Sequence, residues 1–423
     1  MKRNPFWAAI SKVLAVMTVT LIMASILAPG ASVASTEKVL YSFTGGADGS
    51  EPAASRLIFD QTGNIYGTTA SGGLYGAGTV FTLTPNSDGS WAESVLYSFT
   101  GGSDGANPWA GVVFDPAGNL YGTTTEGGIY GAGVVYQLTP NSDGTWTENL
   151  LYTFTGGKDG ANPHAGLIFD KQGALYGTAQ GGGVHGRGNV FELTPDSDGT
   201  WTEIVLHEFT GGKDGSTPYN HAGLIFDATG DLYGTTHGGG AHGYGIAYEL
   251  MPTAKGDWKE KVLHSFTRSE PNSEDTLTFD QAGVLYGTSA GDYQHKCRSC
   301  GTVFKLTPNS NGTWTEQVLH RFKGSDGNDP APGVIFDGNG NLYGAAYIGG
   351  HSNRKCTYDH TCGVVFELTP GADNKWTFRD IYRFKGQDGA NPAELTVDTA
   401  NNIYGTTVVG GAYGAGVVYE ITP

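Results

Sequence analysis

Short runs of β-branched and aromatic residues, each bounded by Gly, Pro, Asn or Asp, follow one another from about residue 35 onward. One stretch reads Gly-Leu-Ile-Phe-Asp at 166–170, Leu-Tyr-Gly-Thr at 175–178, Asn-Val-Phe-Glu-Leu-Thr at 189–194, and a run from Trp to Phe at 201–209. Runs with such composition and boundaries are typical of β-strands. No helical stripe interrupts them, so the pattern predicts an all-β fold built from groups of four antiparallel strands.

These groups recur as a tandem repeat whose clearest marker is the tripeptide Leu/Ile-Tyr-Gly. Its tyrosine occurs seven times, at Tyr66, Tyr121, Tyr176, Tyr233, Tyr286, Tyr343 and Tyr404. Four antiparallel strands per unit are typical of a propeller blade, and seven blades are a common ring size. We therefore predict a single seven-bladed β-propeller over residues 35–423. A β-solenoid is the alternative, although its coils need only about 20–30 residues.

The two ends of this region predict how the ring closes. Residues 37–43 match the fourth strand of the later units, and residues 416–423 match the third strand of the seventh unit. The seventh blade therefore lacks an outer strand of its own, while the N-terminal side has one to spare. Pairing the N-terminal strand with the last blade would close the ring and remove a free sheet edge.

The first 34 residues have a different pattern. Three basic residues within the first twelve positions precede an apolar run at 13–27, which small residues follow up to Ala34. This order is typical of a secretory signal peptide, and the apolar run is shorter than the ~20 residues of a membrane span. We expect cleavage after Ala34, secretion to the extracellular space or periplasm, and no membrane insertion afterwards. An uncleaved membrane anchor is the alternative.

Charge excludes some partners. Without residues 1–34 the chain has 21 basic and 41 acidic residues, a net charge of −20 with His neutral. Such a surface repels phosphate backbones, so nucleic acid is not an expected partner. The Gly-rich loops lack the Lys and the following helix of a phosphate-binding loop, and no cofactor is predicted. We expect a monomer.

The repeated motifs resemble the GloVer (Gloeo–Verruco) tandem repeat of exported bacterial proteins. The resemblance is carried by Val-Leu-Tyr-Ser-Phe-Thr-Gly-Gly-x-Asp-Gly, by Gly-Leu-Ile-Phe-Asp-x-x-Gly-Asn-Leu-Tyr-Gly-Thr-Thr, and by Val-Phe-x-Leu-Thr-Pro. It covers nearly all of residues 35–423 and implies a secreted propeller. It implies no established activity and no catalytic residues.

Residues that recur in the units are expected to serve the scaffold. The Asp that closes each first strand is expected to accept hydrogen bonds from the backbone of the next turn. The Trp that opens most outer strands is expected to pack across the sheet or between blades. The turn Pro-Asn-Ser-Asp-Gly resembles part of a calcium loop, but it lacks the bidentate Glu of such a site. No metal site is predicted.

Departures from the repeat gather where the chain enters the innermost strands. They comprise Arg56, Trp109, His164, Tyr219, His221 and Glu394. Three aromatic residues among them would lie on adjacent blades near the mouth of the central channel. Rings beside hydrogen-bonding side chains suit a sugar or another flat amphipathic ligand. Sequence drift at positions the scaffold leaves free is the alternative. Neighbouring loop residues would extend the surface, namely Tyr75, Tyr130, His185, His242 and Tyr413.

All four cysteines lie in the loops of the fifth and sixth units, at Cys297, Cys300, Cys356 and Cys362. Together with His295 and His360 they offer ligands for zinc. Export favours disulfides instead, and we predict disulfides. Pairing within each loop is the simplest connectivity, and a bridge between the two blades is the alternative.

These observations predict a non-enzymatic secreted protein that binds an extracellular polysaccharide or partner protein at the channel mouth. The enzymatic alternative is a lyase or hydrolase acting on an extracellular polymer. His164 and His221 would then supply general bases, but the spacing shows no carboxylate partner and no Gly-x-Ser-x-Gly motif occurs. No catalytic residue is predicted. A purely structural or interaction repeat is the third alternative.

Overall fold

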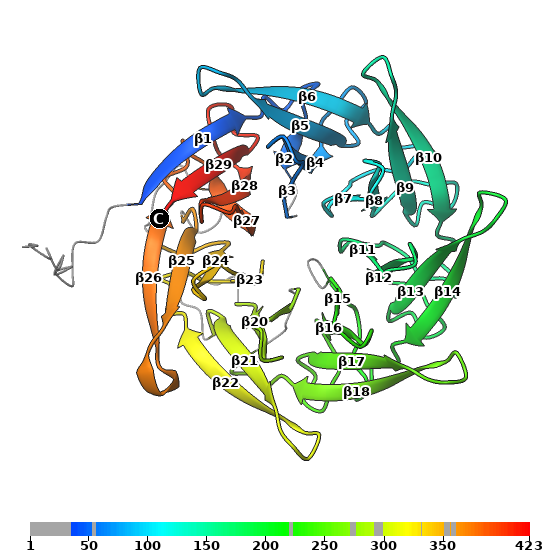
Figure 1. The fold of residues 1–423 in the computed structure, drawn as a ribbon, viewed down its shortest axis with the longest axis vertical. Helices are drawn as coiled ribbons and strands as arrows, with labels where there is room; N and C mark the ends of the chain where they lie inside the picture. The colour runs from blue at the N-terminus through cyan, green and yellow to red at the C-terminus, as the bar shows by residue number, and fades with distance from the viewer. Residues whose placement is uncertain are drawn as a thin grey trace, which may run out of the picture. The chain divides into compact units, whose positions relative to one another are not determined.

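Seven small antiparallel sheets are arranged in a ring around a central channel (Figure 1). The computed structural model describes residues 35–52, 56–219, 223–270, 276–291, 299–330, 332–350, 356 and 361–423, and residues 35–423 form one compact unit. Within the described part of the chain, no helix has the length and hydrophobicity needed to cross a membrane. The predicted all-β, seven-bladed propeller is confirmed.

Each sheet is one blade, with its strands counted from the channel outward. Blade 1 contains β3 (Ile58–Phe59), β4 (Ile65–Ser71), β5 (Thr79–Pro85) and β6 (Trp91–Ser98), and the short β2 (Ser50–Pro52) also pairs with β4. Blade 2 contains β7 (Val113–Phe114), β8 (Leu120–Thr124), β9 (Val134–Pro140) and β10 (Trp146–Thr153). Blade 3 contains β11 (Ile168–Phe169), β12 (Leu175–Ala179), β13 (Asn189–Pro195) and β14 (Trp201–Glu208).

The remaining blades follow the same order. Blade 4 contains β15 (Ile225–Phe226), β16 (Leu232–Thr236), β17 (Ile246–Pro252) and β18 (Trp258–Ser265). Blade 5 contains β19 (Thr278–Phe279), β20 (Leu285–Ser289), β21 (Thr302–Pro308) and β22 (Trp314–Arg321). Blade 6 contains β23 (Val334–Phe336), β24 (Leu342–Ala346), β25 (Val364–Pro370), the 3-10 helix η1 (Ala372–Asn374) and β26 (Trp376–Arg383). Blade 7 contains β27 (Ala390–Val397), β28 (Ile403–Val409), β29 (Val417–Thr422) and β1 (Thr36–Ser42).

The ring closes as predicted, because β1 is the outer strand of blade 7 (Figure 1). It pairs antiparallel with β29, with Glu37 opposite Ile421. On the inner side, Thr396 Oγ1 donates a hydrogen bond to the Leu57 carbonyl oxygen over 2.6 Å, which joins blade 7 to the start of blade 1. Both the outermost and the innermost strands therefore link the two ends of the propeller.

The glycine of the repeated Leu-Tyr-Gly tripeptide is required by close packing within each blade. The aromatic side chain of the third strand lies directly over it. A Cβ on Gly122 would lie 2.4 Å from Tyr136 Oη, and a Cβ on Gly177 would lie 2.6 Å from Phe191 Cζ. Both aromatic residues are fully buried. Any larger residue at these glycines would displace a core ring.

The recurring Asp at the end of the first strand has the predicted role in the turn. Asp115 Oδ1 accepts hydrogen bonds from the backbone N–H groups of Ala117 and Asn119 at 2.8 and 2.9 Å. Its Oδ2 accepts from the Asn119 side chain at 2.7 Å and from Tyr121 Oη at 3.1 Å. Burial raises the pKa of this carboxyl, but the hydrogen bonds outweigh burial and hold the pKa below 3.8.

The tryptophans that open the outer strands pack between blades, as predicted. Trp201 of blade 3 lies edge-on to Tyr121 of blade 2, with ring centroids 6.3 Å apart. The same contact recurs in Trp258 with Tyr176, Trp314 with Tyr233, and Trp376 with Tyr286. These tryptophans are therefore part of the interface between blades.

A second repeated feature is a pair of acidic side chains at the outer seams, which are the interfaces between the outer strands of adjacent blades. Between blades 1 and 2, Tyr97 donates its hydroxyl to Asp104 Oδ2 over 3.1 Å. Burial first, and then the negative charge of Asp104, raises the pKa of Glu148 to about 7. The Oε1 atom of Glu148 is buried without a hydrogen-bond partner among the described residues. The corresponding glutamates of four other blades have the same raised pKa of about 7, namely Glu93, Glu203, Glu260 and Glu316.

Candidate functional site

A pocket with a volume of about 200 Å³ opens where the innermost strands begin. Six of the seven blades contribute residues to its lining. The wall along the channel is apolar and contains Ile58, Val113, Ile168 and Ile225, which are the first residues of β3, β7, β11 and β15. The pocket therefore surrounds the start of the channel.

One structural position recurs around this pocket. It lies two residues before the innermost-strand residue that pairs with the repeated tyrosine, as in Ile168 opposite Tyr176. Blade by blade it is occupied by Arg56, Gly111, Gly166, Gly223, Thr276, Gly333 and Glu394, and all but Gly333 line the pocket. A Cβ on Gly166 would meet no atom within 4 Å. Gly166 thus leaves open space at the channel mouth, whereas a Cβ on Gly223 would lie 2.6 Å from Thr276 Oγ1.

The two charged members of this ring lie on adjacent blades. Arg56 immediately precedes the buried Leu57 of blade 1, and Glu394 lies within β27 of blade 7. Arg56 is exposed and makes no hydrogen bond or ion pair with any described residue, whereas Glu394 is half-buried. The pocket consequently offers guanidinium donors and a carboxylate acceptor at one level of the channel.

Aromatic rings form a continuous row across blades 2 to 4. The centroids of Trp109 and His164 are 5.5 Å apart with their planes at 20°, and those of His164 and Tyr219 are 5.8 Å apart at 30°. His237 then meets the edge of this row, with its centroid 5.5 Å from that of Tyr219. His164 lies between Trp109 and Tyr219 in this row, whereas the half-buried Trp109 has no second ring contact among the described residues.

Hydrogen bonds fix the segment that carries Trp109. Thr68 Oγ1 on the neighbouring blade donates to the Ala110 carbonyl oxygen over 2.9 Å. The Asn107 carbonyl oxygen accepts from the Trp109 N–H at 2.9 Å and from Thr125 Oγ1 at 3.0 Å. Bonds from two blades therefore hold the Trp109 backbone in place at the channel mouth.

The structure brings most of the predicted site residues together. Arg56, Trp109, His164 and Glu394 all line the pocket, and Tyr219 joins the aromatic row without lining it. His221 lies outside the described residues. Their role in binding stays a prediction.

Sequence reasoning missed His237, Thr276 and the apolar channel wall. Thr276 could have been found, because it stands four residues before Asp280 just as Gly166 stands four residues before Asp170. His237 gave no such signal, because only the fold places it against Tyr219.

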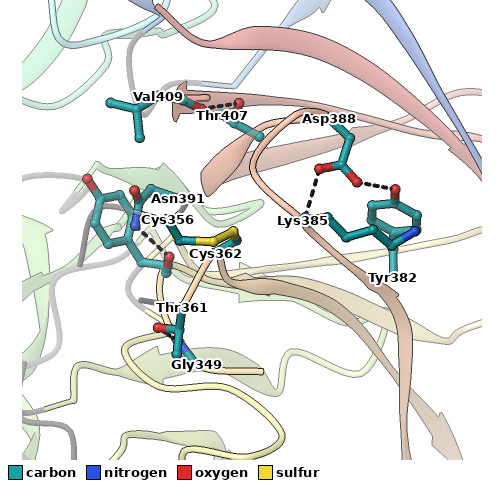
Figure 2. Close-up of a disulfide and its surroundings, with 11 residues drawn as sticks. Gly349, Cys356, Thr361, Cys362, Tyr382, Lys385, Asp388, Asn391, Thr407 and Val409 are labelled. Atoms are coloured by element: carbon teal, nitrogen blue, oxygen red, sulfur yellow. Dashed lines mark hydrogen bonds between the residues drawn. A yellow bond between two sulfur atoms is a disulfide. The ribbon is translucent and has the colours of Figure 1, made fainter. Parts of the chain in front are cut away.

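The cysteine loop of blade 6 contains a disulfide between Cys356 and Cys362 (Figure 2). Both residues are buried, at 4% and 0% exposure, and they belong to the hydrophobic cluster between blades 6 and 7. The Cys362 carbonyl oxygen accepts a hydrogen bond from the Asn391 N–H over 2.9 Å. Pairing within this loop is confirmed, and neither sulfur is left as a thiolate for zinc.

In blade 5, Cys300 is also disulfide-bonded and is 4% exposed. Cys297 lies outside the described residues, and so do the two histidines considered as zinc ligands, His295 and His360. The predicted disulfides are therefore supported at three of the four cysteines.

Comparison with known families identifies the repeat. The family model described as Gloeobacter/Verrucomicrobia repeat matches residues 61–298 and 289–423. The chain therefore belongs to this repeat family, in agreement with the resemblance seen in its motifs. No curated protein is similar to the chain in sequence.

Several solved structures are similar to the chain at low identity. A protein proposed to be a 6-phosphogluconolactonase from Bacteroides uniformis is 14% identical, with a TM-score of 0.49 over 77% of this chain and 83% of that one. A glucose dehydrogenase is 15% identical, with a TM-score of 0.43 over 92% and 99%. A protein of unknown function from Dyadobacter fermentans is 11% identical, with a TM-score of 0.43 over 92% and 98%. Likeness at this level gives no information on activity.

Proposed function

We propose that this propeller of the Gloeobacter/Verrucomicrobia repeat family is a secreted binding protein that holds a carbohydrate at the channel mouth. The observation that carries the proposal is the pocket whose lining brings the half-buried ring of Trp109 together with Arg56 and Glu394. The apolar face of a sugar ring packs against an aromatic face. Its hydroxyl groups accept hydrogen bonds from a guanidinium and donate them to a carboxylate.

The surface charge favours a neutral carbohydrate. A net charge of −20 for residues 35–423 repels polyanions such as uronate-rich or sulfated polymers. A neutral polysaccharide meets no such barrier. The signal-like segment at residues 1–34 would bring the protein to the compartment where such polymers occur.

The test is affinity retention of the protein without residues 1–34 on insoluble cellulose, xylan, starch and chitin. Trp109→Ala should lose at least tenfold in affinity, about 1.4 kcal/mol, because the stacking face is removed. Ile204→Ala is the control, because Ile204 is a 48% exposed apolar residue on the outer strand β14 that does not line the channel-mouth pocket. Equal retention of Trp109→Ala and the unaltered protein would contradict the proposed site.

A partner protein is the second candidate, and exposed loop tips favour it. The glycine-rich loops of blades 1, 2, 3 and 7 present large apolar side chains to solvent. Among them are Leu74, Tyr75, Ile129, Tyr130, Val184 and Tyr413, all at least 59% exposed. If Tyr75→Ala with Tyr130→Ala abolishes a phenotype that Trp109→Ala leaves intact, the loop tips carry the function and the pocket does not.

A further inference from the structure

We propose that the pocket recognises the terminal residue of a glycan and does not recognise internal segments of the chain. This inference rests on the proposed carbohydrate function and states which part of the carbohydrate is bound. Three observations carry it: the way the blades surround the pocket, the single available stacking position, and the placement of the two charged side chains.

The lining surrounds its ligand instead of forming a groove. The repeated ring position contributes Arg56, Gly111, Gly166, Gly223, Thr276 and Glu394 from six different blades. An internal segment of a linear polymer has a chain leaving in both directions, so it needs a site open at two ends. Beyond this ring the channel wall is formed by the apolar side chains of Ile58, Val113, Ile168 and Ile225, which offer no hydrogen bonds to a hydroxylated chain. A chain end therefore enters the ring, while the rest of the glycan points out of the mouth.

The dimensions fit a small part of a glycan. The pocket volume of about 200 Å³ is below the roughly 300–1,000 Å³ of pockets that enclose drug-sized ligands. Stacking is limited in the same way. His164 lies between Trp109 and Tyr219, so the row does not provide three successive platforms for three sugar rings. Trp109 is the ring of this row that lines the pocket without lying between two others, so it offers a stacking position for one sugar ring.

Arg56 and Glu394 supply the chemistry that distinguishes an end from the interior. A terminal residue carries one hydroxyl that an internal residue has converted into a glycosidic bond. A guanidinium with no partner among the described residues and a carboxylate at the same level can donate to and accept from that hydroxyl. An internal residue lacks that hydroxyl and forfeits these hydrogen bonds, so internal segments bind more weakly than a terminal residue.

The experiment compares glycans that differ in length and in the presence of ends. Isothermal titration would use cello-, xylo-, malto- and chito-oligosaccharides of two to six residues. Maltohexaose would be compared with α-cyclodextrin, which has the same six glucose units and no end. End recognition predicts a dissociation constant per molecule that changes less than twofold with length, and at least tenfold weaker binding of any cyclic counterpart.

Two variants locate the effect within the pocket. Gly166→Leu would fill the space that is open around Gly166, and binding should fall at least tenfold without loss of thermal stability. Arg56→Gln should weaken terminal-residue binding by a similar factor. Ile204→Ala should leave every dissociation constant unchanged, because Ile204 lies on the outer strand β14 and does not line the pocket.

The outcomes separate this inference from the proposed function. Affinity that rises steadily with length, or equal binding of cyclic and linear glucans, would overturn end recognition and leave carbohydrate binding intact. Retention of the protein on insoluble polymers without binding of any soluble oligosaccharide would also overturn end recognition and leave carbohydrate binding intact. Absence of binding to all four polymers and all four oligosaccharide series would overturn both.

Discussion

One position of the repeat lies at the outer seams and another lies at the channel mouth. The two positions differ in how far the repeat preserves the residue there. At the seams, a glutamate with a raised pKa recurs on the outer strands of five blades, as Glu93, Glu148, Glu203, Glu260 and Glu316. At the mouth, the equivalent positions carry Arg, Gly, Gly, Gly, Thr, Gly and Glu in turn. A residue kept in most blades is expected to serve the blade itself. A residue found on one blade is a candidate for a role at the channel mouth.

This comparison predicts that a glycine of the Leu-Tyr-Gly tripeptide and a glycine at the channel mouth respond differently to the same substitution. Gly122→Val would force side-chain atoms against Tyr136 and should lower the free energy of unfolding by ~3 kcal/mol. Gly166→Val enters open space and should change it by less than about 0.5 kcal/mol. Denaturant titration measures both values. Equal destabilisation would show that the mouth glycines also serve the scaffold.

The turn Asp offers a smaller test of the scaffold. Asp115→Ala removes the acceptor of two backbone N–H groups and should cost about 2 kcal/mol. Asp143 also accepts a backbone hydrogen bond, from Thr145 at 3.0 Å, but lies on an exposed hairpin. Asp143→Ala should cost less than about 0.5 kcal/mol. A larger loss for Asp143→Ala would contradict the assignment of Asp115 to the structural turn.

The smallest expected effect is the pH dependence of stability at the seams. The raised pKa of about 7 for Glu148 favours its protonated form in the folded state. The stability that Glu148 contributes in this way is fully present below its pKa in the unfolded chain, near 4.5, and is lost as the pH rises through about 7. The turn aspartates have lowered pKa values, as in Asp60 and Asp115, so their contribution is lost only as the pH falls below about 3.8.

Thermal stability should therefore be greatest near pH 5 and fall by a few degrees on going to about pH 8. Differential scanning calorimetry across this range measures the change. Glu148→Gln should make the melting temperature depend less steeply on pH, because one of the five glutamates no longer titrates. A melting temperature that rises between pH 5 and 8 would contradict the raised pKa values.

Much of the fold could be predicted because the scaffold residues repeat. The tyrosine spacing indicated the number of blades, and the match of residues 37–43 to an outer strand indicated the closure. Strand lengths were predicted less well at the channel. Residues 166–170 were expected to form a strand, but only Ile168–Phe169 pair.

The site could be predicted only in part. Sequence departures identified Arg56, Trp109, His164 and Glu394, since non-repeated residues are visible in any alignment of the units. The sequence pattern grouped Arg56 with Trp109 among the departures from the repeat. The strand pairing of Ile58 with Tyr66 and of Val113 with Tyr121 instead places Arg56 in line with Gly111. The stacking of one ring on another depends on the distance between blades, which no single repeat encodes.

The pairing of β1 with β29 also sets the order in which the molecule can be completed. A ribosome makes Thr36–Ser42 first among the strands and Val417–Thr422 last, yet these two segments are neighbours in one sheet. Contacts between such distant segments are formed slowly, because a long loop must close first. A chain broken off before Val417 would hold an unpaired β1 with an exposed edge. Ring closure therefore distinguishes a finished polypeptide from an unfinished one.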